Sequence, residues 1–183
     1  MLIDAHKATL LVVDVQQRLI GAVTDPAGTL ARIRWLLQVA GELDLPVVIS
    51  EQYPQGLGPT VTELSAVAPA ARVVEKRHFS CVAADCLPAD VLAREQLIVC
   101  GMETHVCVLQ TVLDLCALGK QVFVVDDACA SRTAYSHATG IQRMRDAGAQ
   151  IVSREMVAFE CLHSSSHAKF RLISKTFLVV EQP

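Results

Sequence analysis

The alternation of short apolar runs with longer helical patterns is the feature that most constrains how this chain can fold. Six apolar runs have the length of strands and are rich in Val, Ile and Leu: residues 9–14, 46–50, 72–76, 96–101, 121–126 and 149–152. Runs this short are typical of strands that are buried on both faces. Between several of them, apolar residues recur at helical spacing, at residues 27–43, 104–118 and 133–147.

Strands that alternate with helices at this interval predict a parallel sheet, because each helix packs back onto the sheet through a right-handed crossover. We therefore predict a three-layer, Rossmann-like α/β fold with a six-stranded, mainly parallel sheet and helices on both faces. Shorter helices are expected at residues 88–94 and 165–175, and two prolines and two glycines predict a loop at residues 51–59. The 183 residues contain no evident linker or repeat and are predicted to form one domain, residues 1–183.

The composition and the charge argue against several classes of protein. Apolar residues make up 52% of the chain and charged residues 19%, which favours a large core over disorder. The formal net charge is −3 and the basic cluster at residues 76–78 is short, so we expect no nucleic-acid partner and no membrane partner. No apolar run reaches the roughly 20 residues that a membrane helix needs.

The cysteines and the first residues bear on the compartment. The seven cysteines, an odd number without a CxxC pair, are not expected to form a disulfide framework. Charges within residues 1–8 are unlike those of a signal peptide. We predict a soluble, cytoplasmic protein. A mean hydropathy of +0.39 in a small chain also predicts a homo-oligomer, a dimer or a tetramer, in which some apolar surface is covered.

Three reactive side chains occur where strands are expected to end. Asp14 ends the first run, Lys76 ends the third, and Cys107 lies near the start of the helix after the fourth. Functional groups of parallel sheets gather beyond the carboxyl ends of the strands, so we expect these three to meet. A helix start and a lysine would favour the Cys107 thiolate, and Asp14 would act as general base and then as acid. Candidate walls of a substrate pocket flank these segments: Gln16, Leu19, Tyr53 and Phe79.

Each of the three residues also has a structural explanation. An aspartate after a strand often caps a turn, a lysine there is often solvated, and a helical cysteine is often a core residue. Their convergence at one edge of the sheet favours catalysis. The acids at residues 126–127 could bind a ligand, but Ser131 or Thr133 capping the next helix is the simpler interpretation of that segment.

Three motifs, in order and at matching spacing, make the chain similar to the isochorismatase-like cysteine hydrolases, the superfamily that also contains nicotinamidases and N-carbamoylsarcosine amidase. These motifs are LVVDVQ at residues 11–16, EKRHFS at residues 75–80 and CGMETHVCV at residues 100–108. In addition, SEQYPQGLGP at residues 50–59 resembles a loop of the isochorismatase domain-containing proteins of animals and their bacterial relatives. The likeness covers almost the whole chain.

The resemblance implies that Asp14, Lys76 and Cys107 form a catalytic triad. It also implies a cis peptide between Met102 and Glu103, with the backbone N–H groups of Glu103 and Cys107 forming an oxyanion hole. The expected reaction is hydrolysis of an amide or related C–N bond of a small molecule through a Cys107 thioester. Isochorismatases that act on isochorismate lack a cysteine at the position of Cys107, so vinyl-ether hydrolysis is the less favoured alternative.

Metal, cofactor and nucleotide sites are each disfavoured by the residues present. Nicotinamidases carry a metal site built from an Asp-x-His loop, whereas residues 51–54 (EQYP) contain no histidine. His163 and His167 have the spacing of metal ligands on one helix face, although such pairs are more often solvated. We predict no metal and no cofactor. A nucleotide site is disfavoured because no glycine-rich turn follows the first run, whereas a non-catalytic binding or scaffold role and a redox role for Cys107 remain open.

Overall fold

The computed structural model describes residues 1–178 and contains a six-stranded sheet in which all neighbouring strands are parallel. Its strands are β1 (Ala8–Val13), β2 (Val47–Gln52), β3 (Arg72–Lys76), β4 (Gln96–Met102), β5 (Gln121–Ala130) and β6 (Gln150–Val152). The order of the strands across the sheet is β3-β2-β1-β4-β5-β6. The predicted parallel sheet is confirmed.

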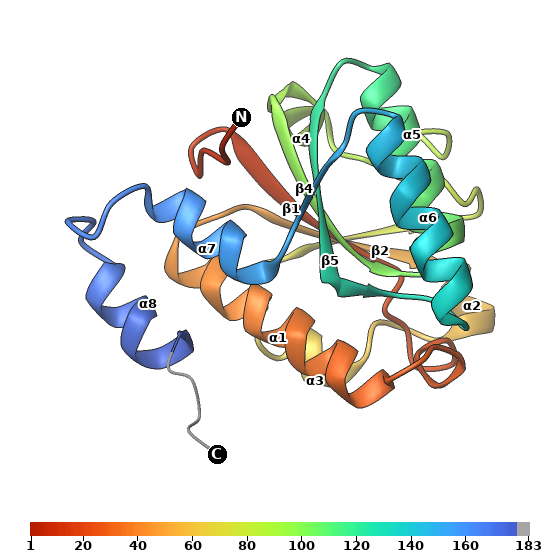
Figure 1. The fold of residues 1–183 in the computed structure, drawn as a ribbon. Coiled ribbons are helices and arrows are strands. Elements are labelled where there is room, and N and C mark those ends of the chain that lie inside the picture. Colours follow the sequence, from red (N-terminus) through yellow and green to blue (C-terminus); the bar gives the residue numbers. More distant parts are fainter. Residues whose placement is uncertain (179–183) are drawn as a thin grey trace.

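Helices cover both faces of this sheet. They are α1 (Pro26–Glu42), α2 (Pro54–Leu57), α3 (Thr62–Ser65), α4 (Ala89–Ala93), α5 (Leu109–Ala117), α6 (Ala134–Asp146), α7 (Arg154–Leu162) and α8 (Phe170–Phe177), with a short 3-10 helix (Ile20–Ala22) and a π-helix (Thr104–Val108). Helices α5 and α6 lie together on one side of the sheet, and α1 and α7 lie on the other (Figure 1). The three-layer, Rossmann-like α/β architecture is therefore confirmed.

The carboxyl ends of β1 and β4 lie where the chain changes its direction across the sheet. The connection after β1 leads to β2, and the connection after β4 leads to β5 on the opposite side. Right-handed crossovers then place the two following helices on opposite faces, which opens a crevice at these strand ends. Both strands are buried over their full length, which explains their uninterrupted apolar sequences.

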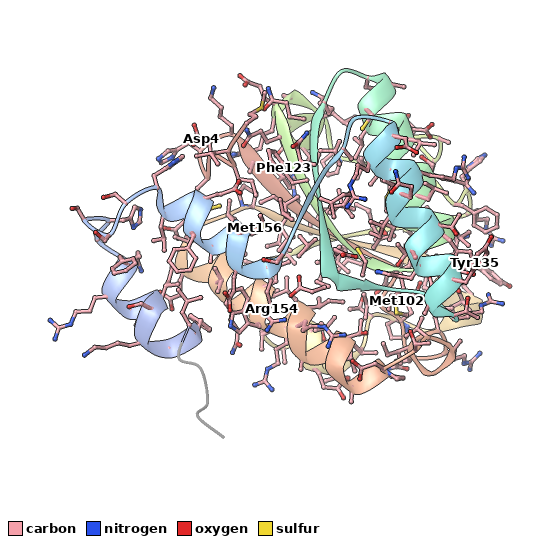
Figure 2. All side chains as sticks on the ribbon, viewed as in Figure 1. Asp4, Met102, Phe123, Tyr135, Arg154 and Met156 are labelled. Atoms are coloured by element: carbon pink, nitrogen blue, oxygen red, sulfur yellow. The ribbon has the colours of Figure 1, made fainter. Side chains whose placement is uncertain are left out.

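The core fills the spaces between the sheet and its helices with aliphatic side chains. Met102 and Phe123 are among the largest fully buried side chains, while Tyr135 on α6 is 81% exposed. Figure 2 shows Phe123 in the interior and Tyr135 on the outer surface. The interior is thus built mainly from Val, Leu, Ile and Ala, in line with the low aromatic content of 4%.

Several predicted boundaries were wrong, and caps and hydrogen bonds explain why. The last helix begins at Phe170 instead of residue 165, and helix α7 was not predicted; Ser153 caps α7 by accepting from the Met156 N–H. The segment 51–59, predicted as a loop, begins with the last two residues of β2 and contains α2. Strand β5 continues to Ala130, so the acids at 126–127 lie within it. The predicted cap at Thr133 is confirmed, since its side chain accepts from the Ser136 N–H.

Two sequence predictions concern the whole chain, of which the structure describes residues 1–178. The single-domain prediction for residues 1–183 includes residues 179–183, which lie outside the described residues, and it stays a prediction. Within residues 1–178, no helix combines the length and the apolar character needed to cross a membrane.

Gly101 allows β4 to approach β1 at the crevice. Its φ is +118°, and a Cβ atom at this position would lie 2.2 Å from the Val13 carbonyl oxygen. An alanine would therefore meet both backbone strain and a clash with a backbone atom that cannot rotate away. We expect Gly101→Ala to lower the free energy of unfolding by roughly 2–4 kcal/mol, as measured by urea denaturation.

The matched control for this substitution is Gly41→Ala. Gly41 lies in α1, and a Cβ atom there would meet nothing within 4 Å. Alanine should stabilise that helix by roughly 0.5–1 kcal/mol. Equal effects of the two substitutions would contradict the assignment of Gly101 as a close-approach position.

Candidate active site

Asp14 and Lys76 form a buried ion pair beyond the carboxyl ends of the strands. The Lys76 Nζ lies 2.6 Å from the Asp14 Oδ2, and both side chains are fully buried. Strand β2, which lies between β1 and β3, supplies a partner for each charge: Ser50 donates to the Asp14 Oδ1 at 2.7 Å, and the Gln52 Oε1 accepts from Lys76 at 2.7 Å. The pair is therefore held by side chains from neighbouring strands, which offsets part of the cost of burying two charges.

The backbone at Asp14 aims its carboxyl group into this cluster. Asp14 follows β1 directly, with φ at 53°, in the left-handed region that aspartate tolerates better than most residues. Its N–H donates to the Ser50 carbonyl at 3.0 Å, which continues the pairing of β1 with β2. The sharp turn that follows fixes the direction of the side chain.

Cys107 comes to the same place from the other side of the crevice. It lies in the π-helix that follows β4 and is 6% exposed. Its thiol lies close enough to Asp14 and Lys76 for both side chains to act on its pKa. The peptide between Met102 and Glu103, just before this helix, is cis. The structure thus brings together the three side chains that the sequence analysis placed at strand ends.

The charges of the cluster perturb one another. Burial raises the pKa of Asp14 above its usual range, although Lys76 opposes this rise. Burial disfavours the Lys76 ammonium, but attraction to and a hydrogen bond with Asp14 oppose this effect, and the pKa of Lys76 is raised. Burial and then the Asp14 charge raise the pKa of the Cys107 thiol, and Lys76 lowers it by less. The raised pKa values of Cys107 and Lys76 therefore favour a resting thiol beside an ammonium.

This state differs from the sequence expectation, in which the helix start and Lys76 would favour a Cys107 thiolate. Lys76 acts in the expected direction, but desolvation of a nearly closed site and the neighbouring Asp14 anion are stronger. A thiolate would have to form as Asp14 takes the proton.

A pH dependence follows from the raised pKa of Cys107. Thiolate is the reactive form, so alkylation of Cys107 by iodoacetamide should be slow at pH 7 and rise about tenfold per pH unit up to pH 9. Peptide mapping of the alkylated chain after short exposures measures this rate. A midpoint at or below that of a free cysteine would contradict the raised pKa.

Comparison with known proteins assigns this chain to a family. A family model described as the isochorismatase domain matches residues 8–156. The chain belongs to the isochorismatase family. Isochorismatase domain-containing protein 2A of Mus musculus is 41% identical over 151 residues, which cover 81% of this chain and 70% of that protein. The secreted isochorismatase effector Isc1 of Phytophthora sojae is 36% identical over 176 residues, which cover 93% of this chain and 84% of that protein.

Solved structures share the whole isochorismatase fold. A Caenorhabditis elegans protein described as MAR1 ribonuclease matches with a TM-score of 0.91 and 32% identity, over 100% of this chain and 95% of that one. The YcaC gene product of Escherichia coli, described as an octameric hydrolase of unknown specificity, matches with a TM-score of 0.83 and 26% identity, over 97% and 96%. The resemblance inferred from the motifs is therefore confirmed.

The predicted pocket residues fall into two groups in this isochorismatase-family chain. Gln16 is fully buried, and its side-chain amide is already bonded to the backbone of Gln52 and Gly58, so it holds the loop after β2 in place. Leu19 is partly buried against the core. Tyr53 and Phe79 are 43% and 51% exposed, and so they remain available to a ligand or to a second copy of the chain.

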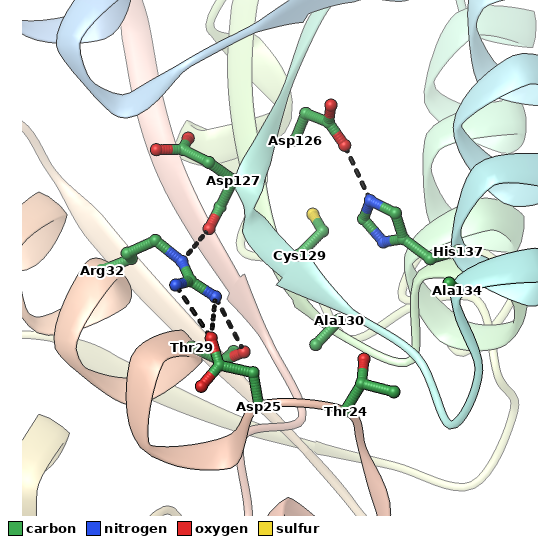
Figure 3. A pocket seen from close by; sticks show the side chains of 10 residues that line it. All are labelled: Thr24, Asp25, Thr29, Arg32, Asp126, Asp127, Cys129, Ala130, Ala134 and His137. Carbon is green, nitrogen blue, oxygen red and sulfur yellow. Dashed lines mark hydrogen bonds and ion pairs between the residues drawn. The ribbon is translucent and has the colours of Figure 1, made fainter.

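Two cavities lie on this edge of the sheet, and one of the two is lined by a triad residue. One of about 460 Å³ is lined by Tyr53, Pro54, Gln55, Glu75, Lys76, Arg77, His78 and Ala84. The Lys76 side chain itself is fully buried and turned towards Asp14. Another, of about 350 Å³, lies between α1, β5 and α6 (Figure 3). Its charged side chains are already paired, for example Arg32 with Asp25 and Asp126 with His137.

Two polar neighbours of the triad were missed or left without a role. Ser50 was recognised as a strand end, but its bond to Asp14 depends on strand order, which no single run reveals. Gln52 was placed in a loop. Cys81 is a further thiol near Lys76, where the neighbouring Cys86 and then the Lys76 charge lower the pKa of Cys81 to about 7. The signal in the sequence was that Cys81 follows Lys76, a strand end, by only five residues.

The structure shows how side chains that could bind a metal ion are arranged. Among residues 1–178, no group of three or more His, Cys, Asp or Glu side chains is arranged to hold a metal ion. His163 is the C-cap of α7 and His167 precedes α8, so the two do not share one helix face as their spacing had allowed.

Proposed function

We propose that this chain is a cysteine hydrolase that cleaves an amide or related C–N bond of a small molecule through a Cys107 thioester. The observation that carries this proposal is the buried Asp14–Lys76 pair, with the Cys107 thiol near enough for both charges to act on its pKa. A nucleophile, a base and a cation at one point are the parts that acyl transfer needs. The family membership supports a hydrolase, since its relatives include one described as a hydrolase.

The first half-reaction transfers the acyl group to sulfur. Asp14 accepts the Cys107 proton while the sulfur attacks the substrate carbonyl carbon, and the carbonyl oxygen takes the negative charge. The C–N bond then breaks, and Asp14 returns the proton to the leaving nitrogen. The raised pKa of Asp14 supports this role, because it makes the carboxylate a stronger base than an exposed aspartate.

The second half-reaction hydrolyses the thioester. Asp14 accepts a proton from a water molecule while the water oxygen attacks the thioester carbonyl carbon. The proton then passes from Asp14 to the departing Cys107 sulfur. Lys76 stabilises the carboxylate, the transient thiolate and the oxyanions by its charge. The backbone N–H groups of Glu103 and Cys107, at the start of the π-helix, are proposed as the oxyanion hole.

The test is a panel of small amides, ureides and carbamoyl compounds, assayed with wild type and Cys107→Ala. Vinyl-ether hydrolysis is the alternative, and a vinyl ether of the isochorismate type belongs in the panel. A non-catalytic role would be supported if the folded wild type turned over none of these compounds and no thiol-directed substrate probe labelled Cys107.

The panel should also contain RNA, because a structural neighbour is described as a ribonuclease. We propose a small-molecule substrate instead, since the net charge is −3 and the cluster at residues 76–78 is too short to follow a phosphate backbone. Cleavage of RNA that Cys107→Ala abolishes would favour the ribonuclease alternative.

We propose a homo-oligomer, a dimer or a tetramer, although the Escherichia coli neighbour is described as octameric. Met156 and Phe159 on α7 are each 49% exposed, and Leu172 on α8 is 44% exposed. Covering such side chains in an interface removes apolar area from water. Light scattering after gel filtration should give a multiple of 19.8 kDa, and 19.8 kDa at micromolar concentration would contradict the prediction.

The compartment and the absence of a metal remain proposals. All seven cysteines are free, as expected for a reducing compartment, and we propose a cytoplasmic location. One relative is described as secreted, so localisation by tagged expression is the deciding observation. No step of the proposed reaction draws on a metal or a cofactor.

A further inference from the structure

Residues 103–105, which we call the catalytic turn, are the residue that follows β4 and the first two residues of the π-helix of Cys107. Their side chains are bonded to residues 126–137. The Glu103 carboxylate, 7% exposed, accepts from the Arg132 Nε at 2.8 Å and from its Nη2 at 3.0 Å. The His105 Nδ1 lies 3.0 Å from the hydroxyl of the buried Ser131. The bidentate pair from Arg132 and the bond from its neighbour Ser131 together fix both the position and the rotation of the turn.

The middle residue of the turn, Thr104, is held by a chain of two bonds. Its buried hydroxyl lies 3.0 Å from the His137 Nδ1, and the His137 Nε2 lies 2.8 Å from the Asp126 Oδ1. A carboxylate only accepts, so Nε2 carries a proton; in the neutral tautomer this leaves Nδ1 to accept from the Thr104 hydroxyl. Figure 3 shows the bond between Asp126 and His137 at the edge of the cavity there.

Strand β5 and helix α6 are shaped for these contacts. Between Val99 and Gly101 of β4 the chain advances two residues, while the paired strand β5 advances five, from Val124 to Cys129, which leaves three extra residues in β5. Such irregularities re-aim side chains beside active sites, and this one contains Asp126. Gly140 of α6 lets the helix approach the turn, since a Cβ atom there would lie 3.1 Å from the His105 Cα.

We propose that residues 126–137 act as a clamp that positions the catalytic turn, with His137, through Thr104, as the central positioning residue. The clamp sets the orientation of the Glu103 and Cys107 backbone N–H groups and the place of the Cys107 thiol relative to Asp14. This inference rests on the proposed function of Cys107. Each residue of the clamp acts through the turn, without a role in bond making or breaking.

Thr104→Val tests the clamp, because valine keeps the shape of threonine but cannot donate to His137. We expect kcat for the best amide of the panel to fall about five- to tenfold with KM changed less than twofold. A loosened turn exposes Cys107, so alkylation by iodoacetamide at pH 8 should become at least about threefold faster. Thr104→Ser keeps the hydroxyl and should restore both values.

A double variant separates positioning from general loss of stability. Thr104→Val and His137→Ala break the same bond, so the pair together should reduce kcat little more than either alone. Gln142→Ala is the matched control: it removes side-chain bonds to Asp146 and Arg145 within α6, on an exposed face, and should change neither readout. Urea titration of all variants sets the conditions under which each is fully folded.

The clamp would be overturned if Thr104→Val had the same kcat and the same alkylation rate as wild type. It would also be overturned if the losses of kcat in the two single variants added fully in the double variant. The proposed function fails separately, if wild type turns over no compound of the panel or if Cys107→Ala remains active. In that case the alkylation rate alone decides on the clamp, since it needs no substrate.

Discussion

Cys107→Ala should abolish hydrolysis of every compound that the wild type cleaves through this site. Without the sulfur no atom can carry the acyl group, and the remaining Asp14–Lys76 pair can only assist direct attack by water. We expect turnover to fall by roughly a thousandfold or more, with substrate binding retained because the backbone N–H groups remain. Steady-state kinetics and equilibrium binding to the variant measure the two effects.

Cys116→Ala is the matched control for this substitution. Cys116 lies on α5, is partly buried, and takes no part in the cluster around Asp14. Its removal should leave turnover at the wild-type level. A Cys107→Ala variant that keeps most of the activity would show that the nucleophile has been assigned to the wrong residue.

Lys76→Ala should be strongly destabilising as well as inactivating. It leaves the fully buried Asp14 carboxylate with no cation beside it, a change that costs roughly 3–5 kcal/mol in buried pairs. The loss should shrink as the pH falls. Without Lys76 the pKa of Asp14 rises further, and a protonated carboxyl group carries no charge to bury. Urea denaturation of wild type and variant between pH 5 and pH 8 measures the difference.

Two further variants distinguish charge from packing at Lys76. Asp14→Asn combined with Lys76→Met removes both charges of this buried pair and should recover much of the stability but none of the activity. Lys76→Arg keeps the charge with a different shape, and should damage turnover less than Lys76→Ala does. If Lys76→Ala changed the free energy of unfolding by less than about 1 kcal/mol, the ion pair would not have the energetic role assigned to it.

The centre of the sheet could be predicted because strands β1 and β4 are buried over their full length. The runs that became β1 and β4 are uninterrupted and short, so a strand was the simplest interpretation of each. The rule that function gathers at strand ends then selected Asp14, Lys76 and the helix of Cys107. What placed Asp14 beside Lys76, on strands separated by β2, was the order of the strands, and this order is a property of the whole sheet.

The parts that sequence reasoning missed depend on contacts between distant segments. Ser50 and Gln52 gain their roles only once β2 lies between β1 and β3. The clamp on residues 103–105 depends on a register shift in β5, which the apolar pattern of that strand does not reveal. The protonated resting state of Cys107 follows from how completely the site closes, and closure is decided by packing around the cysteine.

The central claim is that the acyl group passes through the Cys107 sulfur. Rapid acid quench of wild type with the best amide of the panel, followed by mass spectrometry of the intact chain and its peptides, tests it most directly. The account predicts a burst of one acyl group per active site, attached to Cys107 and absent from Cys107→Ala. An acyl group on another residue, such as Cys81 with its pKa of about 7, or undiminished turnover in Cys107→Ala, would contradict it.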